Sequence, residues 1–185
     1  MTAVGQPGVG AEPSPAGGPA PLQPLVGGAS REEPHTRLAK LGIQLNAGAR
    51  TLLEDSCFDT RAPETLEVVR PRPPPARPRL RRHPPADHRC GTGAGSRPAP
   101  PPDTGPYLRL AITDQGQAPD SILSAGRAPT GAVHVHSVPL RADHDYPKGF
   151  YLRVVDGVTW SRGFRCDEEY VWPADAVLAL RAPDA

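Results

Sequence analysis

The 185-residue sequence lacks close cysteine pairs and long apolar runs. Its three cysteines, Cys57, Cys90 and Cys166, are widely spaced and odd in number, which argues against a disulfide framework and a C-x-x-C zinc site. No apolar stretch reaches the roughly 18 residues of a membrane span, and no basic region followed by an apolar segment opens the chain. We therefore predict reduced cysteines and a cytoplasmic protein outside the membrane.

The net charge of +1 hides a basic block. Residues 70–102 contain eight arginines, eleven prolines and a single acidic residue, Asp87. We interpret residues 71–102 first as a Pro/Arg-rich linker with polyproline II character. A second interpretation is a frameshift product, because GC-rich DNA encodes this alphabet in a wrong frame. A third is a nucleic-acid-binding arm from Arg70 to Arg97, although no aromatic residue is interleaved to stack on bases.

Two segments precede this block. Residues 1–30 are mainly glycine, proline and alanine, and we predict a disordered tail because they bury too little apolar surface to offset chain entropy. Residues 31–70 are predicted to be a helical segment. Their apolar residues recur at spacings of three and four, which is typical of an amphipathic helix over about residues 34–54. These residues are Leu38, Leu41, Leu45, Ala49 and Leu52. A second, short helix is predicted from Pro63, with Leu66 and Val69 on its buried side.

Residues 103–182 are predicted to form a small β domain. Over Tyr107–Thr113, leucine and isoleucine alternate with other residues, which is typical of a half-buried strand. A further strand is expected at Ala132–Val138, and Val177–Leu180 can form a strand or a helical turn. The expected fold class is α+β, with a disordered tail, one or two helices and an antiparallel meander or roll such as an SH3-like barrel.

The most specific local signal is Asp156-Gly157, which separates two β-rich runs within Phe150–Phe164. A type I′ turn needs positive φ at both central positions, and Asp-Gly is a favoured pair there. A two-residue loop also fixes the register, and side chains alternate between the two faces of a hairpin. The face with Phe150 and Leu152 is predicted to be core. The opposite face, which we call the ladder face, carries Tyr151, Arg153, Trp160 and Arg162.

Two short motifs suggest a relationship to a known type of domain. The run ending at Gln115 fits Pro-x-x-x-Gly-Pro-x-Leu-Arg-Leu-x-x-x-Asp-Gln, and Trp172-Pro-Ala-Asp175 supplies a Trp-x-x-Asp turn. With these motifs, residues 102–180 resemble a bacterial domain associated only with hypothetical proteins, and the resemblance implies no activity. Members of that domain carry a continuous helical segment before the Pro-x-x-x-Gly-Pro run. Residues 70–101 depart from this pattern, which adds weight to the frameshift interpretation.

The residue types suggest two different functions. The ladder face is the first candidate site, because Trp, Tyr and Arg are enriched at binding hot spots, although such pairs also simply stabilise sheets. It predicts a non-enzymatic binding or interaction module with an unknown protein partner and no cofactor. The alternative is a small metal-dependent hydrolase, because histidines and carboxylates on neighbouring segments can bind zinc. Its candidate ligands are His134, His136, His144 and Asp143.

Limited proteolysis tests the interpretation of residues 70–102. The eleven prolines from Pro71 to Pro102 leave few backbone donors for helix or sheet. An arginine-specific protease should therefore cut this block first and leave a resistant C-terminal fragment. Protection of these arginines in the free protein would contradict the prediction.

Overall fold

The computed structural model describes residues 21–58, 61–70, 99–116, 129, 131–135, 137–166, 170, 172 and 176–182. The predictions made for residues 1–20 of the tail and for residues 71–98 of the basic block lie outside the described residues, as does His136.

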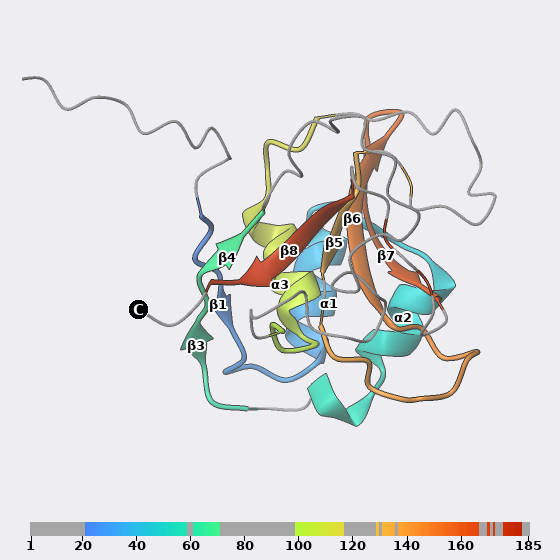
Figure 1. Cartoon of the computed structure of the whole chain (residues 1–185). Helices are drawn as coiled ribbons and strands as arrows, with labels where there is room; N and C mark the ends of the chain where they lie inside the picture. The colour runs from blue at the N-terminus through green and yellow to red at the C-terminus, as the bar shows by residue number, and fades with distance from the viewer. Residues whose placement is uncertain are drawn as a thin grey trace, which may run out of the picture.

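The described residues form an α+β structure, as the sequence predicts (Figure 1). The helical elements are α1 (Glu32–Lys40), α2 (Ala47–Leu53), the 3₁₀ turn η1 (Ser56–Phe58) and α3 (Thr104–Ala111). The strands are β1 (Leu25–Val26), β2 (Gln44–Leu45), β3 (Glu64–Thr65), β4 (Val68–Val69), β5 (Val133–Val135), β6 (Gly149–Val155), β7 (Val158–Phe164) and β8 (Val177–Arg181). Among them no helix has the length and apolar character needed to cross a bilayer.

The main sheet has six strands in the order β2-β7-β6-β5-β8-β4, and β1 pairs with β3 in a separate two-stranded sheet. The pairs β2–β7 and β5–β8 are parallel, so the sheet is mixed and not the expected meander of antiparallel neighbours. Its two outermost strands, β2 and β4, come from the segment that we expected to be helical. Residues 31–70 and 103–182 therefore contribute to one sheet.

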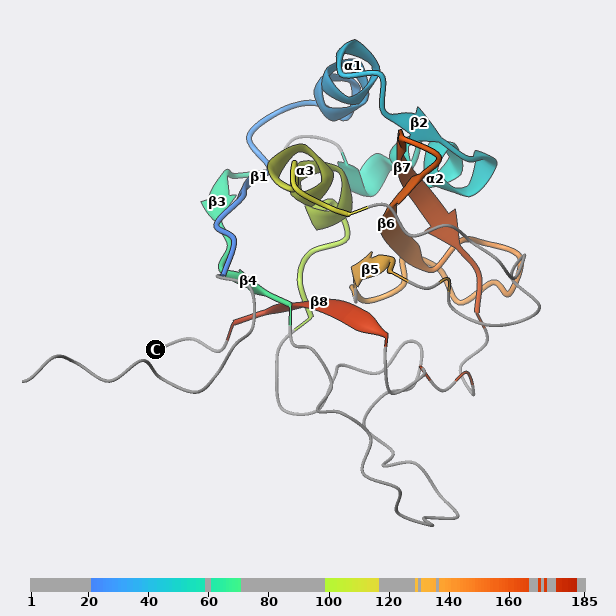
Figure 2. The ribbon, with the colours of Figure 1, turned by 90° about the horizontal axis from the view of Figure 1, so that it is seen from above.

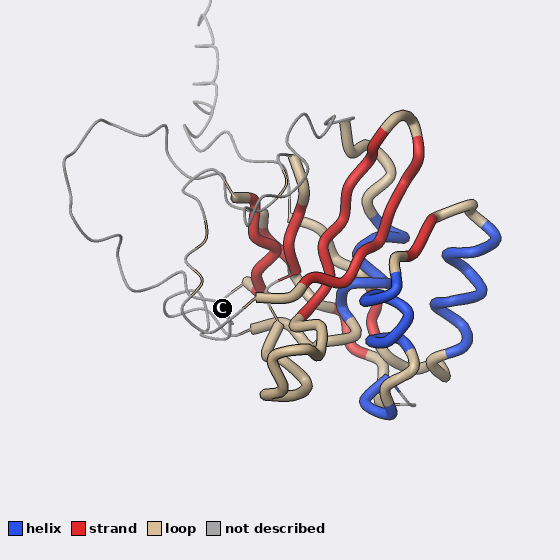
Figure 3. The backbone as a smooth tube through the Cα atoms, turned by 90° about the vertical axis from the view of Figure 1, so that its right-hand side faces the viewer, coloured by secondary structure: helices blue, strands red, loops and turns tan. Residues whose placement is uncertain are grey.

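The β6–β7 hairpin confirms the local prediction (Figure 3). Asp156 and Gly157 have φ values of 50° and 74°, as a type I′ turn requires. Arg153 pairs with Trp160 across the strands, which is the predicted register. The neighbouring strand β5 is also found where it was expected, and β8 resolves the choice at Val177–Leu180 in favour of a strand.

The helices cover one face of the sheet. α2 and α3 pack against the side of the hairpin that carries Phe150 and Leu152, which are 1% and 0% exposed, and α1 packs on α3 as an outer layer (Figure 2). Glycine allows two close approaches of the layers. A Cβ atom at Gly105 in α3 would lie 2.5 Å from the Phe150 ring, and one at Gly163 would lie 2.4 Å from the backbone of Gly48.

The expected helix over residues 34–54 is interrupted. Gly42 has a φ of 67°, and Ile43 donates its N–H to the carbonyl of Leu38, which is the Schellman ending of a helix. The chain then forms β2 and reaches Asn46, the N-cap of α2, whose side chain accepts the Ala49 N–H at 2.9 Å. Leu38 of α1 and Ala49 and Leu52 of α2 are buried as predicted, whereas Leu41 is 65% exposed and Leu45 lies in β2.

Three other element predictions are wrong. Residues 21–30 were expected to belong to the disordered tail, but Leu25–Val26 form β1, which pairs with β3, and Val26 is fully buried. The segment from Pro63 forms β3 and β4 because it pairs with β1 and β8, partners that are distant in sequence. Residues Tyr107–Thr113 were expected to be a strand, yet most of them lie in α3. Leu108 and Ile112 are four residues apart and are both buried, a spacing that suits one face of a helix as well as it suits alternation.

The prediction of reduced cysteines is wrong for Cys166, which is disulfide-bonded two residues after β7. An odd number of cysteines without close spacing argues against a framework of bridges, but it leaves room for a single one.

Substitution of Gly157 by Val should destabilise the protein. The left-handed conformation at this position is strained for a β-branched residue, so we expect a loss of more than about 1 kcal/mol in the free energy of unfolding. Gly116→Val is the matched control, because Gly116 has an ordinary φ and open space around its Cα. Denaturant unfolding monitors both variants, and equal midpoints would contradict the turn assignment.

Candidate functional site

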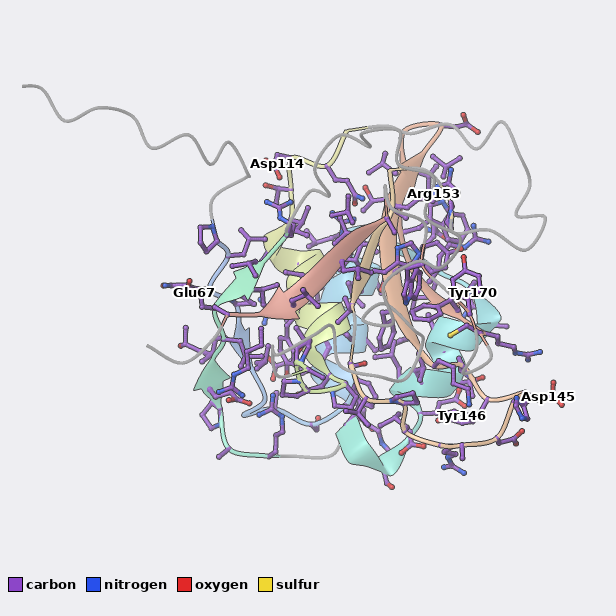
Figure 4. All side chains as sticks on the ribbon, viewed as in Figure 1. Glu67, Asp114, Asp145, Tyr146, Arg153 and Tyr170 are labelled. Carbon is purple, nitrogen blue, oxygen red and sulfur yellow. The ribbon has the colours of Figure 1, made fainter. Side chains whose placement is uncertain are left out.

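The hairpin places the four predicted residues on one face of the sheet, opposite the helices. The pairing of β6 with β7 sets Tyr151 across from Arg162 and Arg153 across from Trp160. Tyr151, Trp160 and Arg162 are half-buried, whereas Arg153, which is labelled in Figure 4, is only 1% exposed. Arg153 is therefore buried on the ladder side of the sheet and does not contribute to an exposed binding surface.

Arg162 lies against two aromatic rings. Its guanidinium carbon is 5.0 Å from the ring centre of Trp160 and 5.9 Å from that of Tyr151. Its Nε is buried without a hydrogen-bond partner, and it forms no ion pair with a carboxylate of the described residues. A cation over an exposed aromatic ring contributes roughly 0.5–1 kcal/mol, so the rings hold the guanidinium in place without neutralising it.

The aromatic contacts continue from Tyr151 across the sheet. His134 on β5 stacks on Tyr151 with ring centres 5.4 Å apart and an interplanar angle of 21°. Trp172 packs on the same imidazole at 4.6 Å, and Phe164 contacts both rings edge-on. These residues and the buried Leu178 of β8 give the ladder side of the sheet a second, smaller core. Sequence reasoning missed this cluster because its members come from four different strands, β5, β6, β7 and β8, and from the segment before β8.

The candidate metal ligands that the structure describes do not lie together. His134 is 2% exposed among aromatic rings, whereas His144 and Asp143 lie exposed in the loop before β6. His136 is outside the described residues. Within the described part of the chain, no group of three or more His, Cys, Asp or Glu side chains could hold a metal ion.

The loop at residues 141–148 is fixed by charged and polar contacts. The Asp55 carboxylate accepts hydrogen bonds from Arg141 at 2.7 Å and from the Tyr146 hydroxyl at 2.8 Å. Burial, followed by the bond to Asp55, raises the pKa of Tyr146 to about 12. Because this folded-state pKa exceeds the ordinary value, the contribution of the neutral phenol to stability is complete below about pH 10 and is lost toward pH 12.

The ammonium of Lys148 closes this loop by donating to the carbonyls of Arg141 at 2.9 Å and Asp143 at 2.6 Å. Asp145 projects outward and is 93% exposed (Figure 4). The loop is thus held in place by Lys148, while the side chain of Asp145 points into solvent. Asp143 accepts the backbone N–H of Asp145, which is the local bond of an ordinary Asx turn.

Arg109 and Gln115, which both belong to the run that ends at Gln115, have a structural role. Arg109 is 3% exposed and donates to the Gln115 side chain at 2.6 Å and to the carbonyl of Ile112 at the end of α3. Burial lowers the pKa of Arg109. The Gln115 amide in turn donates to the carbonyls of Leu152 at 2.8 Å and Gly131 at 3.1 Å. This network ties the end of α3 to the middle of the sheet.

Two clefts lined by described residues lie beside the helices. One, of about 640 Å³, is lined by residues of α1, α2 and their flanks, and its two arginines, Arg31 and Arg50, are matched by Glu32 and Glu54. The other, of about 500 Å³, lies between β1, α1 and α3 above Tyr107. The balanced charge of the first cleft gives it no net attraction for an anion, and the second cleft is likewise lined by one arginine and one glutamate, Arg37 and Glu33.

Comparison of the chain with protein-family models, with curated proteins and with solved structures finds no match in any of the three. The resemblance of residues 102–180 to a bacterial domain stays a prediction.

Replacing Gln115 by Ala should weaken the fold. The change removes the acceptor of a buried arginine and the donor to two backbone carbonyls, for which we expect a loss of about 1–3 kcal/mol in unfolding free energy. Gln44→Ala provides the matched control, since among the described residues its exposed amide donates only to the carbonyl of Gly42, at 3.2 Å. Chemical denaturation of both variants measures the difference, and equal stability would contradict this role.

Proposed function

We propose that the protein is a non-enzymatic interaction module that binds a protein partner through the hairpin end of the ladder face. The observation that supports this most strongly is the pairing of Trp160 with Arg162. Both side chains are half-buried and lie two residues apart on β7. The guanidinium carbon of Arg162 is 5.0 Å from the ring centre of Trp160. Tryptophan and arginine are the residue types most enriched at interface hot spots, where large, pre-ordered side chains contact a partner.

The surroundings of Trp160 support the same proposal. Val155 and Val158 pair at the turn and continue the ladder face beyond Trp160, and Val158 is 40% exposed. A half-buried aromatic residue beside the exposed Val158 and the half-buried Val155 gives an apolar centre with a polar neighbour, which is the arrangement of a small recognition patch. The patch lies on two long paired strands with a fixed register, so little conformational entropy is lost when a partner binds.

A protein partner suits this face better than a nucleic acid. Non-specific nucleic-acid binding needs a track of cations along the phosphate backbone and aromatic faces open for base stacking. Arg153 is buried, which leaves Arg162 as the accessible arginine of the ladder face, and its guanidinium already covers one face of Trp160. The nucleic-acid arm proposed for Arg70–Arg97 is a separate hypothesis that does not involve this face.

Substitution of Trp160 by Ala tests the proposal. A partner is first identified by cross-linking to the full chain and mass spectrometry, and its affinity is then measured by calorimetry. We expect Trp160→Ala to weaken binding at least tenfold, which is about the 1.4 kcal/mol or more expected at a hot spot. Circular dichroism should show that the variant stays folded.

Val138→Ala is the control, because Val138 is an exposed apolar residue outside the ladder face. It should leave the affinity unchanged. If Trp160→Ala binds the partner as tightly as the unmodified protein does, the interaction surface lies elsewhere and the proposal is wrong.

A further inference from the structure

The guanidinium of Arg162 differs from three other arginines of the described residues in what surrounds it. Arg61 forms two hydrogen bonds to the Asp103 carboxylate at 2.9 and 3.0 Å, and Arg141 donates twice to one oxygen of Asp55, at 3.1 and 2.7 Å. Arg109, although buried, donates to an amide oxygen and a carbonyl. Arg162 has aromatic rings as neighbours and no acceptor among the described residues.

From this difference we infer that Arg162 is the receptor for a carboxylate of the partner, so that the module recognises an acidic peptide segment. The inference rests on the proposed function and specifies the chemistry of its partner. A guanidinium is always charged and carries five donors in a planar fork, and its fit to a carboxylate is bidentate. The buried Nε cannot contribute, so the two terminal nitrogens supply the fork.

The rings make this receptor stronger than an ordinary surface arginine. Trp160 and Tyr151 restrict the side chain, so less rotamer entropy is lost when a ligand binds. They also remove part of its hydration, and a charge-assisted hydrogen bond is stronger where water is displaced. A carboxylate that approaches Arg162 therefore finds a positive group that is held in position, incompletely solvated and not yet neutralised by the described residues.

The presence of a single accessible arginine on the ladder face favours a carboxylate ligand over a phosphate backbone. One accessible arginine matches one acidic side chain, whereas a nucleic acid presents a row of phosphates that would need several cations. The apolar neighbours Trp160 and Val158 suit a peptide in which aspartate or glutamate alternates with leucine or phenylalanine. We therefore expect the preferred ligand to be a peptide in which acidic and apolar residues alternate.

The test uses two fluorescein-labelled peptides and the full chain. The first peptide is Leu-Asp-Phe-Glu-Leu-Asp-Phe, and in the second every Asp is Asn and every Glu is Gln. Fluorescence anisotropy measures the affinity of each for the unmodified protein, Arg162→Gln and Arg50→Gln. Arg50→Gln is the matched control, because it removes the same charge from the exposed surface of α2, away from the ladder face.

We expect the acidic peptide to bind the unmodified protein at least tenfold more tightly than the amide peptide. Arg162→Gln should abolish this preference, and Arg50→Gln should change either affinity less than twofold. Arg162→Lys keeps the charge but not the fork, so it should recover only part of the preference. Equal binding of the two peptides, absence of binding by the acidic one, or an unaltered preference in Arg162→Gln would each overturn the inference.

Two further arms distinguish failure of the carboxylate inference from failure of the proposed function. If Trp160→Ala removes the binding of both peptides while the unmodified protein does not distinguish them, the proposed function stands and the carboxylate inference fails. If Trp160→Ala leaves the affinity for both peptides unchanged, the proposed function fails as well. Tighter binding of a labelled twelve-residue oligothymidylate, lost in Arg162→Gln, would replace the carboxylate by a phosphate and overturn the inference.

Discussion

The register of the β6–β7 hairpin determines which side chains enter the core and which form the ladder face. A turn with positive φ at Asp156 and Gly157 leaves no freedom to slip by one residue, because a slip would exchange the two faces of both strands. Phe150 and Leu152 then point to α3 and α2, and Arg162 points away from them. The position of the proposed binding residues is therefore a consequence of how the core is filled.

Arg109 and Arg162 show two ways in which the fold accommodates a positive charge. Arg109 lies within the protein and is surrounded by the oxygen atoms of Gln115 and the end of α3, whose helix dipole is favourable to a cation. Arg162 is held by rings, which orient a cation but do not neutralise it. The first arrangement uses its arginine to connect a helix to the sheet, and the second leaves a charge that can still be paired.

Local signals in the sequence were sufficient for the hairpin and for β5, because turn chemistry and alternation depend only on neighbouring residues. They failed for α3, where Leu108 and Ile112 fit two periods, and for β3 and β4, which exist because distant strands pair with them. Of the candidate site, the ladder residues were predictable from register. The burial of Arg153 and the contact of His134 with Trp172 were not, since both depend on how separate segments pack.

Both edges of the main sheet are supplied by the N-terminal half of the chain. β2 pairs with β7 at Trp160 and Ser161. Next to this pairing, the Asn46 side chain donates to the carbonyl of Gly163 and accepts the Gly163 N–H. β4 covers β8 at the opposite edge. A polypeptide that began after residue 98 would expose the backbone donors and acceptors of two strands, and such bare edges pair with other copies. The early segments thus cover backbone groups of β7 and β8 that would otherwise be available to pair with other copies of the chain.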